Sequence, residues 1–280
     1  MNMNNLKIFI GVADAGGVTE AAKMLYITQP AVSKAIKNLE EELDTDLFYR
    51  NKRNGMILTD TGEKVLHYAR QMMRMEEQIY QTVFLSKNML GGTLKIAALP
   101  SGSSFFLIDA YTKFHEKYPQ VSIELKEGTA KEVEKMVLDH EVEFGISFVP
   151  SSGLEYRILM EDEIAAITKE KNDIDYFDLT RTKKTYYACQ AAWESLQPFL
   201  DRHFQIGQRN VFKIVSSGSV RKIASEGIGI GLQAKSFLSE NDGYYIYPVK
   251  PQIKTDLALI AYHFHDLTPA ASAFIAMIDK

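Results

Sequence analysis

Three short segments rich in hydroxyl groups stand where helices are expected to begin. They are "PSGSS" after a first buried strand, "EGTAKEV" after the next strand, and "SSGSV" in the second half of the chain. Backbone N–H groups at a helix start, with hydroxyl groups nearby, suit a carboxylate or a similar anion. The alternative is that these residues only cap their helices. The residues predicted to bind such an anion are Ser101, Gly102, Ser103, Thr129, Ser217 and Ser219.

The residues that could support catalysis or hold a metal ion form no familiar motif. The sequence has no G-x-S-x-G, Walker loop or H-E-x-x-H, and "EGIGIG" is not followed by a clear cofactor helix. His263 and His265 lie in a strand-like run and are expected at a core edge rather than as metal ligands. Cys189 is expected to be a small buried residue. We therefore predict no catalytic residue, no metal site and no cofactor.

Residues 28–37 carry the side chains expected of a helix that reads DNA. Gln29 can bond the N6/N7 edge of adenine, Pro30 can touch a thymine methyl group, and Ser33 is short enough for close approach. Thr28 and the helix start can bind a phosphate through backbone N–H groups. Taken alone, the set would also fit a solvated helix face. The predicted DNA contacts are Thr28, Gln29, Pro30, Ser33, Lys34 and Lys37.

The segment "DLFYRNKRNGMILTDTG" predicts a small hairpin after that helix. Two short apolar runs flank the Asn54-Gly55 pair, which is a strong turn signal. Cations on such a hairpin can reach a phosphate or a narrow minor groove, where the negative potential is enhanced. We therefore expect Arg50 and Arg53 to contact DNA and Thr59 to donate to a phosphate. Ordinary surface roles are the alternative.

These polar positions need three short helices to hold them. Apolar residues recur at helical spacing from Leu6, and the Gly16-Gly17 pair is expected to end this first helix. Thr19 offers an N-cap for a second helix, and Thr28 offers one for the third. With the hairpin, the three helices make a winged helix-turn-helix domain over residues 1–60. The apolar side of the third helix is predicted to be Val32, Ile36, Leu39 and Leu43.

A single long linker helix is predicted over residues 61–89, since proline is absent and Gly62 stands at its start. At 1.5 Å per residue it would span roughly 40 Å, more than a domain of about 60 residues can cover. Its apolar seam is therefore expected to pair with a second copy. Packing on the chain's own domain is the alternative. The predicted dimerisation residues are Val65, Met72, Met75 and Ile79.

Residues 90–280 alternate between buried strands and helices, which indicates parallel α/β architecture. We expect two small lobes that together form one domain. Lobe I is predicted over about 91–162 and 254–280, and lobe II over about 163–253.

The composition of the 280 residues limits the possible partners and location. The net charge is −4, and residues 1–89 carry equal numbers of basic and acidic side chains, so any basic surface must be local. The single cysteine allows no intramolecular disulfide. The N-terminal segment lacks the pattern of a secretory leader, and no apolar run is long enough for a membrane helix. A cytoplasmic protein is expected.

The first 66 or so residues resemble the LysR-type transcriptional regulators. The resemblance rests on "AAKMLYITQPAVSKAIKNLEEEL", on "LFYRNKRNGMILTDTG" and on their spacing. More loosely, "LKIAALPSGSS", "FHEKYPQVSIELKEG", "EGIGIGL" and "LTPAASAFI" follow in the order expected of that family. "HEVEFGIS" departs from it, with Glu143-Phe144 where an aspartate is usual, and 153–200 match weakly.

The resemblance implies a winged helix-turn-helix, a linker helix and a two-lobed effector domain like that of periplasmic binding proteins. It also implies a regulator whose operator binding or promoter activation responds to a small, anionic effector held between the lobes. The expected partners are double-stranded DNA with an imperfect palindromic operator, RNA polymerase and further copies of the chain, as a homodimer or a dimer of dimers.

Two other classes of function were weighed against this one. Residues 91–280 alone would suit a solute-binding protein of the periplasmic type, but that function leaves the first 66 residues without a role. An α/β enzyme would need a catalytic constellation, and the sequence offers none. Salt-dependent binding to promoter DNA would distinguish a regulator from both.

Overall fold

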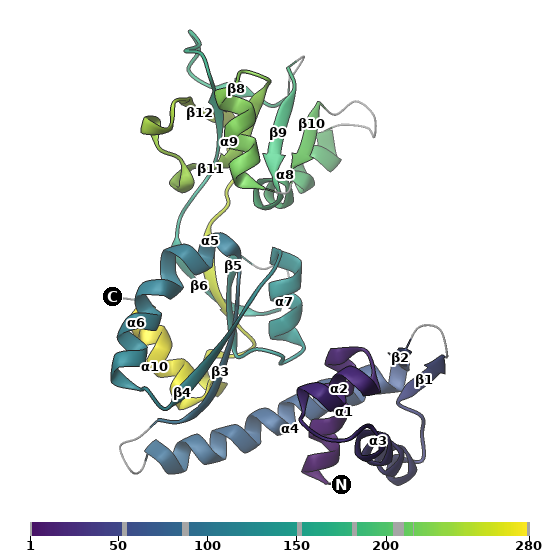
Figure 1. Cartoon of the computed structure of the whole chain (residues 1–280). Coiled ribbons are helices and arrows are strands. Elements are labelled where there is room, and N and C mark those ends of the chain that lie inside the picture. Colours follow the sequence, from purple (N-terminus) through teal and green to yellow (C-terminus); the bar gives the residue numbers. More distant parts are fainter. Residues whose placement is uncertain are drawn as a thin grey trace.

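The computed structural model describes residues 2–51, 55–85, 90–149, 153–180, 184–203, 210–214 and 216–278. These residues form a small helical domain with a hairpin, one long helix and two α/β lobes (Figure 1). The predicted architecture is therefore confirmed. The N-terminal elements are α1 Met3–Ala15, α2 Val18–Met24, α3 Gln29–Leu43, β1 Phe48–Asn51, β2 Gly55–Leu58 and the long helix α4 Asp60–Leu85.

The sequence predicted one end of each of the first three helices, and the predictions for α1 and α3 are correct. Helix α1 ends at Gly16, which adopts the left-handed conformation with φ +69°, as the glycine pair predicts. Thr28 caps α3 by accepting the backbone N–H of Ala31. The predicted cap at Thr19 is wrong, because α2 begins after the extended Gly17 and has no side-chain cap.

The hairpin is fixed to the helices by one glycine and one buried carboxylate. Gly55 has φ +75°, and a Cβ atom there would lie 2.7 Å from the carbonyl oxygen of Gly16. The buried Glu40 of α3 accepts the backbone N–H groups of Leu47 and Phe48 at 2.9 and 3.3 Å. The angle between α3 and the hairpin is therefore set by hydrogen bonds as well as by packing.

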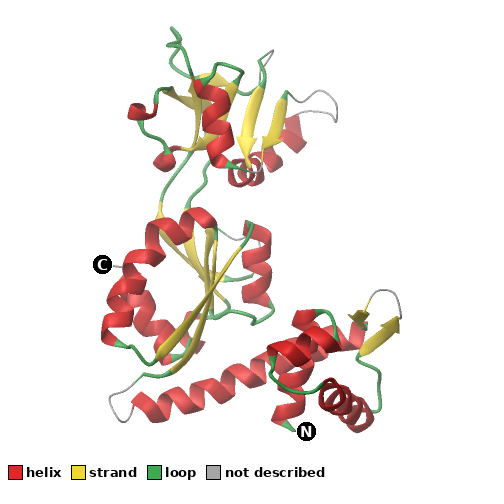
Figure 2. Ribbon diagram, viewed as in Figure 1, coloured by secondary structure: helices red, strands yellow, loops and turns green. Residues whose placement is uncertain are grey.

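Lobe I is a five-stranded sheet in the order β4-β3-β5-β13-β6, in which β13 runs antiparallel to its neighbours. Helices cover both faces of the sheet (Figure 2). Buried apolar residues on the two faces form separate clusters beneath α6 and α10 and beneath α7. Its elements are β3 Gly92–Ala98, α5 Pro100–Gly102, a π-helical turn Ser103–Leu107, α6 Ile108–Lys117, β4 Val121–Glu127, α7 Ala130–Leu138, β5 Phe144–Phe148, β6 Glu155–Met160, β13 Leu257–Ala261 and α10 Pro269–Ile278.

Lobe II is a six-stranded sheet in the order β10-β9-β11-β7-β12-β8. Strands β9, β10 and β11 are parallel, and β7 is antiparallel to β11 and β12. Cys189 is buried in the core of this lobe, as predicted. Its elements are β7 Ile164–Thr168, β8 Phe177–Asp178, β9 Tyr186–Cys189, α8 Gln190–His203, β10 Val211–Ile214, α9 Ser217–Ser225, β11 Ile230–Ala234 and β12 Tyr245–Lys250.

The chain passes between the lobes twice, from β6 to β7 and from β12 to β13. Figure 1 shows α5 at the edge of lobe I that faces lobe II, and the arrowhead of β9 pointing back toward lobe I. The carboxyl ends of the parallel strands of both lobes therefore face each other. In open α/β sheets this is the edge at which ligands bind.

Candidate DNA interface and effector cleft

Helix α3 presents the predicted DNA-reading residues on one exposed face. Its opposite side is buried in the domain core by Val32, Ile36 and Leu39. Leu43, predicted to belong to that side, is 37% exposed, and Ala35 is buried in its place. The exposed set is Thr28, Gln29, Pro30, Ser33, Lys34 and Lys37.

The charges of this face are free to meet a phosphate. Lys37 Nζ lies 3.3 Å from Glu41 Oε1, and both side chains are exposed. Such a pair contributes little to stability, so Lys37 can exchange Glu41 for a phosphate at small cost. The Thr28 oxygen caps the helix as an acceptor, which leaves its proton for donation. The face therefore combines two lysines, short hydroxyl side chains and one amide, that of Gln29.

The predicted DNA contacts of the hairpin lie largely outside the described residues. The backbone of Arg50 lies in β1, but its side chain and all of Arg53 lie outside the described residues. The Thr59 hydroxyl donates to the carbonyl of Asp46 at 3.0 Å and accepts the N–H of Gly62 at 2.9 Å. Thr59 thus caps α4 in this structure, and its phosphate contact stays a prediction.

Tyr26 is a further candidate at the DNA interface that sequence reasoning missed. It lies in the turn just before α3, is 96% exposed and has φ +55°. A bulky residue in the left-handed region is strained, and such strain is found most often at functional sites. The sequence did offer one signal for Tyr26: an aromatic residue stands at a turn position where Asn or Gly is favoured.

The apolar seam of α4 is divided between two uses. Val65 and Met72 pack against the core of the winged domain. Met75 and Ile79 are 61% and 66% exposed. The first half of the seam therefore packs on the chain's own domain, which was the alternative to pairing. The second half is exposed, as are the nearby apolar side chains of Tyr68, Tyr80 and Val83.

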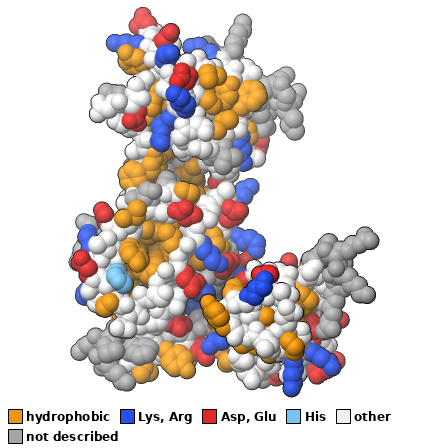
Figure 3. Space-filling view, in the orientation of Figure 1, with side chains coloured by type: hydrophobic (Ala, Val, Ile, Leu, Met, Phe, Trp, Pro, Cys, Tyr) orange, Lys and Arg blue, Asp and Glu red, His pale blue; other side chains and the backbone are white. Residues whose placement is uncertain are grey.

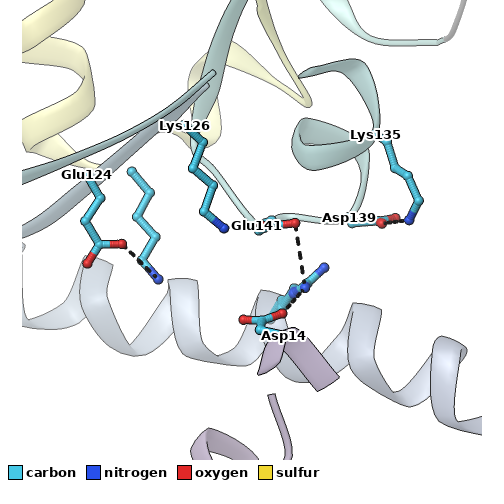
Figure 4. A network of polar contacts seen from close by, with 8 residues as sticks. Asp14, Glu124, Lys126, Lys135, Asp139 and Glu141 are labelled. Atoms are coloured by element: carbon cyan, nitrogen blue, oxygen red, sulfur yellow. Dashed lines mark hydrogen bonds and ion pairs between the residues drawn. The ribbon is translucent and has the colours of Figure 1, made fainter. Parts of the chain in front are cut away.

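Helix α4 also ties the winged domain to lobe I through charges. Arg70 Nη2 lies 2.5 Å from Asp14 Oδ1 of α1 and 3.8 Å from Glu141 Oε2 of lobe I, and Glu141 also pairs with Lys126 (Figure 4). A cavity of about 400 Å³ lies beside this network, between α1, α4 and lobe I. None of the predicted effector residues lines this cavity. A second cavity, at Lys169 and its neighbours, is not lined by them either.

The first predicted effector segment opens a helix at the interlobe edge. The side chain of Ser101 lies outside the described residues, whereas its backbone belongs to α5. Gly102 is required for close packing, because a Cβ atom there would lie 2.6 Å from Ile146 Cγ2. Ser103 is buried and donates its hydroxyl to the carbonyl of Leu99 at 3.3 Å. Gly102 and Ser103 thus hold the helix start on the sheet.

The other two segments act as caps in this structure. Thr129 and Glu132 form a reciprocal capping box at the start of α7, and these hydrogen bonds lower the pKa of Glu132. Ser216, not Ser217 or Ser219, is the N-cap of α9, and it accepts the N–H of Ser219 at 3.4 Å. The alternative that these residues cap helices is therefore correct for Thr129, while Ser217 and Ser219 lie in the first turn.

An acidic side chain of lobe II occupies the start of α7. Glu194 Oε2 of α8 accepts the backbone N–H of Ala130 at 3.2 Å. Ser195 of the same helix donates to Thr255 at 3.2 Å. A carboxylate thus already sits where an anion was predicted, but it belongs to the chain itself and bridges the two lobes.

Two buried polar groups near the facing strand ends have no hydrogen-bond partner among the described residues. They are Ser147 Oγ, near the end of β5, and Gln233 Oε1, near the end of β11. Each costs free energy unless a further group satisfies it. Apolar residues including Leu99, Phe148 and Phe237 form a cluster at the lobe junction, where Figure 3 shows hydrophobic side chains gathered. Sequence reasoning missed both groups, because each looks like an ordinary strand residue.

The remaining expectations concern histidines and membranes. His263 and His265 do not lie in a core: His263 is half-buried and His265 is exposed, beside Glu155. This corrects the predicted placement at a core edge. Within the described ranges, every helix is too short or too polar to cross a bilayer.

Comparison with known proteins agrees with this arrangement. The HTH-type transcriptional regulators YoaU and YvbU of Bacillus subtilis are 33% and 29% identical to the chain, over 99% and 100% of it and 98% of their own lengths. Full-length OxyR from Pseudomonas aeruginosa superposes with TM-score 0.76 at 17% identity, covering 100% of this chain and 97% of that one. CbnR in complex with its target DNA gives 0.57 at 18% identity, covering 99% of both.

Both halves of the chain match the same family. Residues 3–63 match the bacterial regulatory helix-turn-helix proteins of the lysR family, and residues 87–280 match the LysR substrate binding domain. The DNA-binding match also sets aside a solute-binding protein as the function. The chain therefore belongs to the LysR family of transcriptional regulators, with a DNA-binding helix-turn-helix and an effector-binding domain.

Proposed function

We propose that the chain binds operator DNA with α3 in the major groove and Gln29 as its main base reader. The observation that carries this proposal is the division of α3 into a buried apolar side and an exposed face of short polar and cationic residues. Gln29 stands at the start of the helix, where recognition helices approach base edges. Lys34 and Lys37 follow on the same face and supply backbone anchors.

The proposed unit is a homodimer that reads an imperfect palindrome, with a dimer of dimers as the larger assembly. Met75 and Ile79 supply an exposed apolar surface on α4 for this contact. The two-fold symmetry of the protein should appear in the operator, with one winged module on each half-site. In this proposal, residues 1–60 bind DNA, residues 61–89 pair the subunits and residues 90–280 bind the effector.

The proposed effector is a small anion held between the lobes. Helix starts from both lobes stand where the strand ends of the lobes face each other, and Ser147 and Gln233 carry buried polar atoms with no partner among the described residues. A ligand held by both lobes favours their closed arrangement and can shift the equilibrium by its differential affinity. We infer that this change alters contact with DNA and RNA polymerase in the cytoplasm, and that the chain regulates rather than catalyses.

The proposed DNA contacts of Gln29 and Lys34 are tested by fluorescence anisotropy with DNA from the chain's own promoter. Gln29→Ala should lose about 1–3 kcal/mol and relax the preference at one base position per half-site. Lys34→Ala should weaken all sequences similarly and reduce the salt slope by about 1. Lys113→Ala, an exposed lysine of α6, is the matched control. Identical base profiles and salt slopes for the Gln29 and Lys34 variants would refute the proposed assignment.

A further inference from the structure

Glu155, His263 and His265 bring three potential metal-ligand atoms together on the surface of lobe I. One atom from each residue lies within 4.8 Å of the other two. Glu155 begins β6, and the histidines follow β13 around a short helical turn, Phe264–Asp266. Glu155 pairs with Ala261 across the two strands, so the register itself brings the three side chains to one end of the sheet.

Part of the cluster is already held in place. Glu155 Oε1 lies 3.0 Å from His263 Nδ1, and Oε2 accepts the backbone N–H of Phe264 at 2.8 Å. In a tetrahedral zinc site with bonds of about 2.0–2.2 Å, neighbouring ligand atoms lie about 3.3 Å apart. The Glu155–His263 pair is close to that spacing. The side chain of His265 is 73% exposed and can rotate to complete it.

We propose that Glu155, His263 and His265 bind a divalent transition-metal ion of the zinc class. Two imidazoles and one carboxylate are donors that zinc and its neighbours accept, whereas Ca²⁺ and Mg²⁺ prefer oxygen ligands alone. Three protein ligands leave the fourth position for water. Asp266 Oδ1, 3.2 Å from His265 Nε2, provides the carboxylate partner that usually orients a metal-bound histidine.

The charged side chains around the cluster sum to a net negative charge. Arg157 lies two residues along β6 from Glu155, and its guanidinium stacks over the Phe264 ring at 4.3 Å. Asp266 offsets this positive charge from the other side. The carboxylates of Glu155 and Asp266 together outweigh the single guanidinium of Arg157, which leaves a net attraction for a dication.

The position of the site gives it access to the linker helix. Arg74 and Gln78 of α4 both donate to the backbone carbonyl of Asp266, the residue after His265. A bound ion would order the turn Phe264–Asp266, to which α4 is hydrogen-bonded. This turn lies at the junction between the linker helix and lobe I. The site is separate from the interlobe cleft and does not depend on the effector proposed for it.

The test is calorimetric titration of the full chain, stripped with chelator, with ZnCl₂. Wild-type protein should bind one ion per chain, and His265→Ala and Glu155→Gln should each weaken binding at least about tenfold. Glutamine can still accept the Phe264 N–H, so Glu155→Gln tests the ligand rather than the fold. His115→Ala removes an exposed histidine of α6 and should bind like wild type.

Co²⁺ provides a second readout that reports the ligands themselves. The chain loaded with Co²⁺ should show the visible absorption of a tetrahedral site, and His263→Ala should lose it while His115→Ala retains it. Absence of the band in wild type, or the same zinc affinity in wild type, His265→Ala and Glu155→Gln, would overturn the proposal.

Discussion

The side-chain oxygen of Gln81 accepts the backbone N–H of Ala270 at 3.0 Å, so the linker helix α4 caps helix α10 of lobe I. The Gln81 side chain is fully buried, and its amide group also donates to Glu77 at 3.0 Å. The neighbouring start of α10 is capped by the buried Glu143, which accepts both the N–H and the hydroxyl of Thr268. The linker is therefore part of the effector domain's own hydrogen bonding.

Gln81→Ala should destabilise lobe I by about 1–3 kcal/mol, because it leaves a buried N–H without an acceptor. The measurement is the urea midpoint of the full chain, followed by circular dichroism. Thr82→Ala, at the adjacent exposed position, is the control and should shift the midpoint little. Equal shifts for both variants would mean that the cap contributes nothing to stability.

Met75→Lys combined with Ile79→Lys should convert the proposed dimer to monomers without unfolding the chain. Both side chains are more than half exposed, so the substitutions remove no core contact of the single chain. Two buried cations in a dimer seam would be costly unless they were paired. Light scattering gives the mass, and circular dichroism verifies the fold. An unchanged mass would show that the subunits associate elsewhere.

Glu194→Gln should loosen the contact between the lobes and favour binding of anions. The carboxylate now sits at the start of α7, where a charge contributes about 0.3–1 kcal/mol. Without this charge, sulfate or acetate should raise the melting temperature of the variant more than that of wild type. Glu116→Gln on α6 is the matched control. If sulfate and acetate stabilise both proteins equally, Glu194 does not compete for the anion position.

The sequence predicted those features that depend on neighbouring residues. The helical period of Val32, Ile36 and Leu39, the cap at Thr28 and the left-handed conformation of Gly55 all follow from local rules, and the structure has each of them. These rules also placed the strands and helices that follow one another as β-α units, from β3 to β5 and from β9 to β11.

Features that depend on distant partners could not be predicted in the same way. Thr59 has a side chain suited to phosphate, but only the tertiary structure shows that its hydroxyl donates to the carbonyl of Asp46, 13 residues away. The spacing of Val65 likewise cannot distinguish a contact with the chain's own α1–α3 from a contact with a second copy. In the sequence, Glu40 looks like part of an exposed acidic run. Only the structure shows that it is buried and accepts the N–H groups of Leu47 and Phe48.

His140 should make stability depend on pH between neutrality and about pH 4. Burial, together with Arg74 and His67, lowers the pKa of His140 to about 4, against the opposing effect of Asp139 and Asp266. The unfolded chain, in which the histidine pKa is about 6.5, takes up a proton below that pH, while the folded chain does not. Stability should therefore fall as the pH drops through this window, by up to about 3 kcal/mol at its lower end.

His140→Asn is the variant that tests this dependence. His140 has φ +53°, a conformation that Asn tolerates, so the backbone is preserved. Carboxylates also titrate in this range, and the comparison of wild type with the variant removes their common contribution. Between pH 7 and pH 5 the free energy of unfolding should fall by about 2 kcal/mol more in wild type than in His140→Asn. His115→Asn, at an exposed site, should behave as wild type. The same fall in wild type and His140→Asn would show that His140 is protonated as readily in the folded chain as in the unfolded one.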